Sequence, residues 1–166
     1  MSAGAGIVVG INGSAASRVA VRWASREAER RDLPLTLVHA ASTRLTRLAE
    51  RKLVLGNHEL PHRRVQHIID DAVDVAGDSA RRDGPPEVTV KLVFTEPVDA
   101  LTESSRDAEL VVVGSRHRSS LRRALFPTVG SALTVRSRCP LAVISERNRR
   151  MPHPGHSPVD VGVTGW

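Results

Sequence analysis

The sequence predicts an α/β fold: an open, five-stranded parallel sheet with helices on both faces. Five short apolar runs divide the 166 residues, and segments with a helical period lie between them. Most of the runs are continuous rather than alternating, as in strands that are covered on both faces of a parallel sheet. The length allows one domain with a full core and is too short for two ordinary α/β domains.

The first strand is expected at Ile7–Ile11 and the second at Leu35–Val38. Between them, residues 15–31 place apolar side chains three and four positions apart, with arginines on the opposite face, which predicts an amphipathic helix. Asp32 and Pro34 then end this helix before the second strand begins.

Residues 42–64 are rich in arginine and contain two histidines, and we expect a helix or loop there that borders the mouth of the site. The run Val88–Phe94 alternates more than the others, which favours a place near the edge of the sheet. Pro97 suits the first turn of a helix. The other elements expected in this part of the chain are helices at 65–80, 98–106 and 129–135 and strands at Leu110–Val113 and Leu141–Ile144.

Positive charge is concentrated in one late segment. Residues 114–150 hold nine arginines and one acidic residue, Glu146, for a net charge of +8, whereas residues 1–113 have a net charge of −1. Such an asymmetry suggests an anionic partner near this segment, and the alternative is a solvated basic surface.

Two strand ends carry residues suited to ligand binding. In a parallel sheet, ligands bind beyond the carboxyl ends of the strands, at the topological switch point. After the first strand, Gly10 and Gly13 would let the backbone turn and approach a ligand, and Ser14 can cap the following helix, whose N-terminus favours an anion. After the fourth strand, Gly114 opens a loop of serines and arginines that can hold phosphates.

These segments resemble the universal stress protein family. The resemblance rests on "GIVVGINGSAASRVAVRWASREAERRDLPLTLVHA", "AELVVVGSRHRS" and "RCPLAVIS", and covers about residues 6–145 in the family's element order. It implies a Rossmann-like sheet of the adenine nucleotide alpha hydrolase type, in a cytoplasmic and usually dimeric protein that acts in the stress response. Some members of the family bind ATP and others do not.

If this member binds ATP, the resemblance places base and ribose at the end of the first strand and near Ala40, with the phosphates on the loop after the fourth strand. The expected ligand-binding residues are Gly10, Asn12, Ala40, Gly114, Ser115, Arg116, His117, Arg118, Ser119, Ser120, Thr128 and Val129.

The nucleotide motif of the ATP-binding members is altered in this chain. Their pattern G-x2-G-x9-G-[ST] falls on Gly114, His117, Pro127 and Thr128, so two of its three glycines are replaced. Pro127 has no N–H to donate. Asn12 stands where these members usually have aspartate, and lacks the charge that would help to hold a divalent cation, so a role for Mg²⁺ stays open.

Three hypotheses follow. The first is a regulatory module that binds ATP and hydrolyses it at most slowly, since Ser14 and Ser115 have no identifiable base partner. The second is a domain without nucleotide that serves as a dimerisation or partner-binding subunit. The third, a nucleic-acid binder, is disfavoured by an aromatic content of 2%, which leaves few stacking platforms. We expect a homodimer through the edge strand Leu141–Ile144, because an unpaired apolar edge is an association site.

Other candidate sites have simpler explanations. The seven histidines form no ligand-spaced set with carboxylates or cysteine, so no metal site is expected. His39 follows an apolar strand and is predicted to be a buried, hydrogen-bonded histidine. Cys139, the only cysteine, is predicted to be a small buried side chain, and no apolar run is long enough to span a membrane.

The end of the sequence repeats its beginning. Val161–Gly165 aligns without a gap on Val9–Gly13. We therefore expect a family domain at residues 1–146, a linker at 147–158 and, at 159–166, the first strand of a second repeat. The alternative is a chance similarity over five residues.

Overall fold

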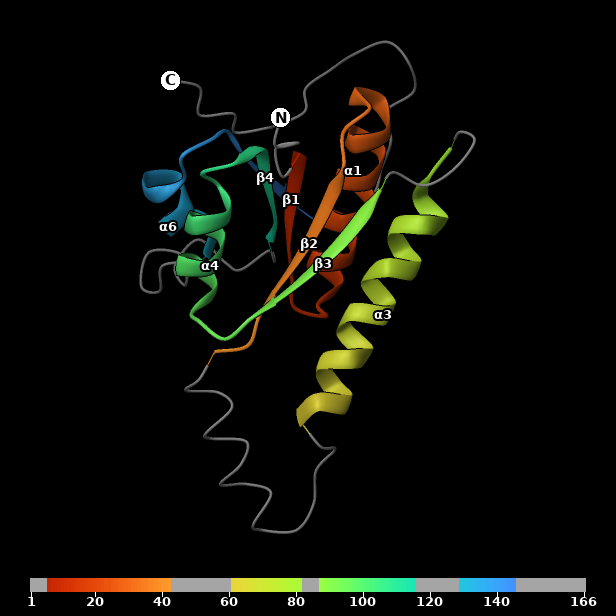
Figure 1. The fold of residues 1–166 in the computed structure, drawn as a ribbon, viewed down its shortest axis with the longest axis horizontal. Helices are drawn as coiled ribbons and strands as arrows, with labels where there is room; N and C mark the ends of the chain where they lie inside the picture. Colours follow the sequence, from red (N-terminus) through yellow and green to blue (C-terminus); the bar gives the residue numbers. More distant parts are fainter. Residues whose placement is uncertain (1–5, 43–60, 82–86, 116–128, 146–166) are drawn as a thin grey trace, which may run out of the picture.

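The computed structural model describes residues 6–42, 61–81, 87–115 and 129–145, and it confirms the predicted fold class (Figure 1). All the strands are parallel and form a five-stranded sheet in the order β3-β2-β1-β4-β5. In chain order the elements are β1 (Gly6–Ile11), α1 (Ala15–Arg31), β2 (Leu35–Ala40), α3 (Pro61–Ser79), β3 (Val88–Val93), α4 (Pro97–Ser104), β4 (Ala108–Ser115), α6 (Val129–Arg136) and β5 (Leu141–Ser145).

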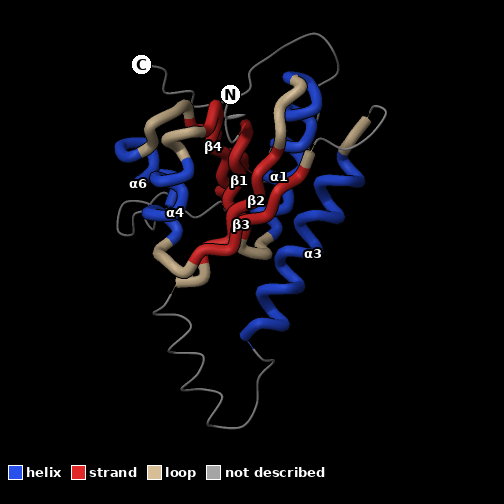
Figure 2. The backbone as a smooth tube through the Cα atoms, in the orientation of Figure 1, coloured by secondary structure: helices blue, strands red, loops and turns tan. Residues whose placement is uncertain are grey.

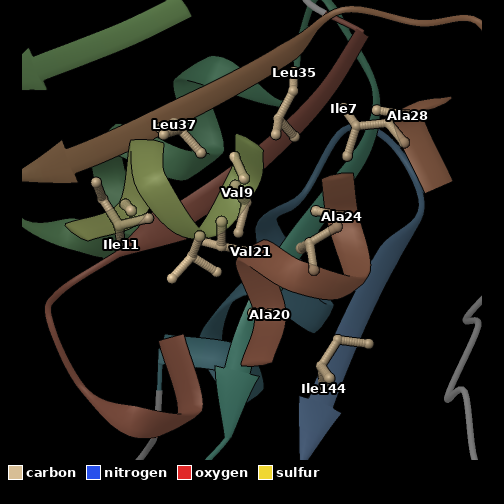
Figure 3. Packing of buried hydrophobic residues seen from close by; sticks show 14 of the residues in the cluster. Ile7, Val9, Ile11, Ala20, Val21, Ala24, Ala28, Leu35, Leu37 and Ile144 are labelled. Carbon is tan, nitrogen blue, oxygen red and sulfur yellow. The ribbon is translucent and has the colours of Figure 1, made fainter. Parts of the chain in front are cut away.

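Helices cover both faces of the sheet, which gives a three-layer arrangement (Figure 2). Helices α1 and α3 pack on one face, where their apolar side chains meet one side of the strands (Figure 3). Helices α4 and α6 cover the other face with a smaller cluster that includes Leu101 and Leu133. Strand β1 lies at the centre, and its residue Ile7 is paired with Leu35 of β2 and with Leu110 of β4.

Helix α1 agrees with the prediction at both ends. The Ser14 hydroxyl accepts a hydrogen bond from the N–H of Ser17 at 3.1 Å, as an N-cap should. Asp32 ends the helix in the left-handed conformation, with φ of 55°. In the middle of α1, the fully buried Ser25 donates a hydrogen bond of 2.8 Å to the carbonyl oxygen of Ala76, which joins α1 to α3.

The other elements differ from their predicted limits by a few residues. The largest difference is in α3, which begins at Pro61 rather than Val65, because its first turn is polar and carries no apolar period. Strand β4 extends to Ala108 and Ser115, beyond the predicted apolar run. Of the segment 42–64, residues 43–60 lie outside the described part of the chain, and so does the tail at 146–166.

The edges of the sheet are β3 and β5, and the edge position expected for residues 88–94 is confirmed. Strand β3 is the less covered of the two: Val90 and Leu92 are 37% and 40% exposed, and Phe94, directly after the strand, is 64% exposed. Among the described helices, none is long and apolar enough to cross a membrane.

Candidate functional site

A pocket lies at the carboxyl end of the central strands, at the switch point of the sheet. The chain turns from β1 to β2 and β3 on one side and returns to β4 on the other, so the ends of β1 and β4 leave a crevice between their connections. The pocket has a volume of about 100 Å³. Its walls come from three strands, three helices and the turn after β1: Gly10, Ile11, Asn12, Ser17, Val38, Ala40, Pro97, Leu101, Val113, Gly114 and Val129.

Gly10 has a different role from the predicted one. It lies within β1 rather than in a turn, and a Cβ atom there would approach Cδ1 of Leu101 to 2.9 Å. The missing side chain therefore lets α4 settle on the sheet and lets Leu101 form a wall of the pocket. The turn depends on Gly13 instead, which has φ of +74°.

Gly114 is required by packing against α1. A Cβ atom at this position would lie 2.3 Å from the carbonyl oxygen of Ala16, which no side chain could relieve, because the obstacle is backbone. The absence of a side chain brings the first turn of α1 against the end of β4. As a result, the N-terminus of α1, which favours negative charge, lies beside the pocket.

Asn12 lies at the mouth of the pocket and is exposed. Its side-chain oxygen accepts a hydrogen bond from the backbone N–H of Ser14 at 3.0 Å. The backbone N–H of Asn12 donates to the Ser17 hydroxyl at 3.2 Å. These bonds hold the turn between β1 and α1. The side-chain amide N–H group, which no hydrogen bond engages within the described ranges, is the part of Asn12 that is available to a ligand.

The structure brings five of the predicted site residues together in this pocket: Gly10, Asn12, Ala40, Gly114 and Val129. Ser115 ends β4 directly after Gly114. The other predicted residues, and the altered motif position Pro127, lie outside the described residues: Arg116, His117, Arg118, Ser119, Ser120 and Thr128.

Sequence reasoning missed the walls that come from α4. Pro97 and Leu101 line the pocket from the helix that precedes β4, a part of the chain with no glycine or polar motif. Their role as pocket walls follows only from the packing of α4 on the sheet. The sequence pattern of Ser17, Val38 and Val113 predicts only their places in a helix or a strand, and does not indicate that they line a pocket.

Histidine, cysteine and metal-ligand candidates were also placed by the structure. The ring of His39 is 8% exposed, and its Nδ1 lies 2.9 Å from the carbonyl oxygen of Ile11, so the predicted buried, hydrogen-bonded histidine is confirmed. Cys139 is half-buried rather than fully buried, and burial raises the pKa of its thiol, which keeps it protonated at neutral pH. Over the ranges that the structure covers, no three His, Cys, Asp or Glu side chains gather as metal ligands.

Comparison with known families agrees with this geometry. The model of the universal stress protein family matches residues 6–145, from the first residue of β1 to the last of β5. The chain belongs to the universal stress protein family.

This universal stress protein domain is also similar to curated proteins from mycobacteria. It is 41% identical over 160 residues to Universal stress protein Rv2623 of Mycobacterium tuberculosis, and 35% identical over the same length to Universal stress protein Rv2005c of that species. Each alignment covers 96% of this chain and 54% of the relative. The chain thus spans about half the length of the curated relatives that it matches.

Solved structures of the family share the fold. One is a universal stress protein in complex with cAMP, with a TM-score of 0.61 and 24% identity, over 86% of this chain and 98% of that chain. Another is a family protein from Arabidopsis thaliana with AMP bound, with a TM-score of 0.56 and 16% identity, over 90% of this chain and 97% of that chain. At these identities the likeness establishes the fold, and the nucleotides belong to those two proteins.

Proposed function

We propose that this universal stress protein domain is a regulatory module that binds an adenine nucleotide at the carboxyl ends of β1, β2 and β4. The observation that carries the proposal is the pocket at the switch point, lined by Gly10, Asn12, Ala40, Gly114 and Val129. Two structural relatives hold adenine nucleotides, which supports the choice of ligand class.

The lining suits a base better than a phosphate. Val38, Ala40, Leu101 and Val113 present apolar surface, and Asn12 is the polar group at the edge. The volume of about 100 Å³ is below the roughly 300–1,000 Å³ of complete small-molecule sites. The described walls therefore account for part of a nucleotide, and we propose that the phosphates lie toward the N-terminus of α1 and the carboxyl end of β4.

Binding rather than turnover is the proposed activity. A nucleophile needs a base within hydrogen-bond reach. Beside the pocket, the hydroxyls of Ser14 and Ser17 are engaged in the cap and turn of α1. ATP is the specific nucleotide that we propose, with Mg²⁺ dispensable because the side chain at position 12 is an uncharged amide.

Calorimetric titration tests the proposal, with ATP added in the presence and in the absence of Mg²⁺. We expect saturable binding to the native protein, and we expect Ala40→Leu, which fills the pocket, to abolish it. Ala80→Leu makes the same chemical change beyond the end of α3, away from the pocket, and should leave binding intact. Absence of heat at millimolar nucleotide would refute the assignment of a nucleotide site and would leave the assignment of the fold unchanged.

The alternative is a family domain that has lost its nucleotide and serves as a partner-binding subunit. The replaced motif glycines at His117 and Pro127 favour it. The double substitution His117→Gly and Pro127→Gly separates the two: binding that appears only in this variant would establish the alternative.

We further propose a cytoplasmic homodimer that is formed through β5. This strand is an edge of the sheet, and among the described residues no other strand pairs with it on the side away from β4. A second copy that pairs its own β5 would extend the sheet across the dimer.

A further inference from the structure

A second cavity lies at the other end of the sheet. It has a volume of about 570 Å³ and is lined by Thr102 and Arg106 at the end of α4 and by Val135, Arg136, Ser137 and Arg138 at the end of α6. We call it the arginine cavity. Helices α4 and α6 lie side by side on one face of the sheet, and β4 and β5 begin directly after these segments (Figure 1). The arginine cavity is therefore at the amino ends of the strands, opposite the candidate nucleotide pocket.

We propose that the arginine cavity binds a small molecule that bears an oxyanion, a phosphate or carboxylate group, through Arg106, Arg136 and Arg138. Arg106 follows α4, whereas Arg136 and Arg138 lie at the end of α6, so the fold brings two separate segments of the chain to one cavity. Guanidinium groups present flat forks of N–H donors that match the oxygens of phosphate and carboxylate. The proposal is independent of whether the other pocket holds a nucleotide.

The neighbouring acids leave most of the donors unused. The Nη2 atom of Arg136 lies 2.8 Å from Asp99, and the Nε atom of Arg106 lies 3.2 Å from Glu103. Each guanidinium has five N–H donors, so one such contact leaves several of them free. Both pairs are more than half exposed in their side chains and contribute little to stability. For Arg138, the ranges that the structure covers contain no ion pair, so three guanidinium groups face two carboxylates.

The floor of the cavity is held rigidly before any ligand arrives. The hydroxyl of Ser105, which is 1% exposed, accepts a hydrogen bond from the N–H of Arg138 at 2.8 Å and donates one to the carbonyl oxygen of Thr102 at 2.6 Å. Ser137 donates through its own N–H to Leu133 at 2.8 Å. These bonds fix the backbone that carries Arg138, and such preorganisation lowers the entropy lost on binding.

Thr102 and Val135 supply the remaining chemistry of the cavity. The Oγ1 atom of Thr102 is buried and has no hydrogen-bond partner among the described residues. A buried polar atom without a partner is unfavourable, so a ligand would relieve this cost if neighbouring side chains shifted to let it reach the hydroxyl. Val135 is 83% exposed, which offers an apolar contact to the body of an organic anion.

The test is nuclear magnetic resonance of the whole chain, titrated with pyrophosphate for the phosphate source and citrate for the carboxylate source, at constant ionic strength set with sodium chloride. We expect saturable shifts of the backbone amides of residues 102–106 and 136–138 with at least one of the two probes. Arg138→Ala should weaken the binding about tenfold, the effect of one lost charge-assisted contact.

Two control variants and one comparison keep the test decisive. Arg64→Ala removes an exposed arginine of α3 and should leave the affinity unchanged. Ala40→Leu blocks the other pocket and should also leave it unchanged, so a failure of the nucleotide proposal would be recognised separately. Shifts that match those of chloride alone, or binding of a polyglutamate peptide without any response to the small anions, would overturn the proposal. A Thr102→Val variant with lowered affinity and unchanged stability would support the role of its hydroxyl.

Discussion

At the scale of single residues, glycines decide how closely the layers approach one another. Gly10 and Gly114 both lie in strands and both face a helix, and in each case the space for a Cβ atom is occupied by that helix. Their place near a ligand pocket is a consequence of this packing. The residues that flank a candidate binding site are thus also the residues that fix its walls.

The first prediction concerns Gly114. Gly114→Ala places a methyl group 2.3 Å from the Ala16 carbonyl oxygen, so α1 must shift, and we expect unfolding to become easier by about 3 kcal/mol. Gly77→Ala is the matched control: nothing lies within 4 Å of its Cβ position in α3, and alanine there should raise stability by about 0.5–1 kcal/mol. Urea titration of both variants gives the comparison, and similar effects of the two changes would contradict it.

Gly10 and Gly114 also show the limit of what the sequence could predict. The apolar runs and the helical periods predicted the strands, the helices and the parallel sheet, because each signal is local to one element. Leu101 contacts Gly10 from a helix about ninety positions later in the chain, and no local pattern announces that contact. The arginine cavity was missed for the same reason, since Arg106 and Arg138 meet only in the folded sheet.

At the scale of elements, α1 is the best anchored helix. It contributes to the core on one face and is joined to α3 by the hydrogen bond of Ser25. Near its C-terminal end, the carboxylate of Glu27 forms ion pairs with both Arg30 and Arg31. The hydrogen bond from Arg30 is the main cause of the lowered pKa of the Glu27 carboxyl. Burial opposes it, and the smaller contributions of Arg31 lower the pKa further. Arg30 and Arg31 also suit the negative end of the helix dipole.

The second prediction follows from Glu27. Its pKa is lowered in the folded state, so its contribution to stability is fully present above its unfolded pKa of about 4.3 and is lost as the pH falls through the lower, folded pKa. The destabilisation caused by Glu27→Gln should therefore be largest at neutral pH and shrink on acidification below about pH 4. Urea unfolding at pH 7 and pH 3.5 measures it.

The control for Glu27 is Glu103→Gln. The carboxyl of Glu103 forms a single contact with Arg106, and both side chains are more than half exposed. An effect as large as that of Glu27→Gln would show that solvent does not weaken exposed pairs in this protein, contrary to expectation.

At the scale of the whole molecule, the two edges of the sheet differ in their surroundings. Strand β3 exposes Val90 and Leu92, and Phe94 directly after it is also exposed, whereas β5 keeps Leu141 and Ile144 buried beneath the helices. The proposed dimer uses the backbone of β5. Because β3 exposes apolar side chains, the β3 edge is the alternative dimer interface.

The third prediction distinguishes the edges. The N–H of Val111 bonds to Pro140, so in a parallel ladder the N–H of Val143 points away from β4. Val143→Pro removes that donor without breaking the sheet, and we expect it to convert a dimer into a monomer. The same alternation holds where β3 pairs with β2: the N–H of Leu35 bonds to Glu87, so the N–H of Val90 points away from β2. Val90→Pro removes this outward donor and should leave the dimer intact. Sedimentation measures both, and a monomer produced only by Val90→Pro would place the interface on β3.

The order of the strands also governs how the molecule is made. Strand β1 is the centre of the sheet, yet its second neighbour, β4, begins at Ala108, about a hundred residues after β1 in the chain. During synthesis, β1, β2 and β3 emerge first, and the flank of β1 that pairs with β4 stays open until Ala108–Ser115 has left the ribosome. Pairing across such a separation is slow, because a long loop must close before the contact forms. The nascent chain therefore passes through an interval in which β1 can pair with β2 on one side only, while its other edge waits for β4.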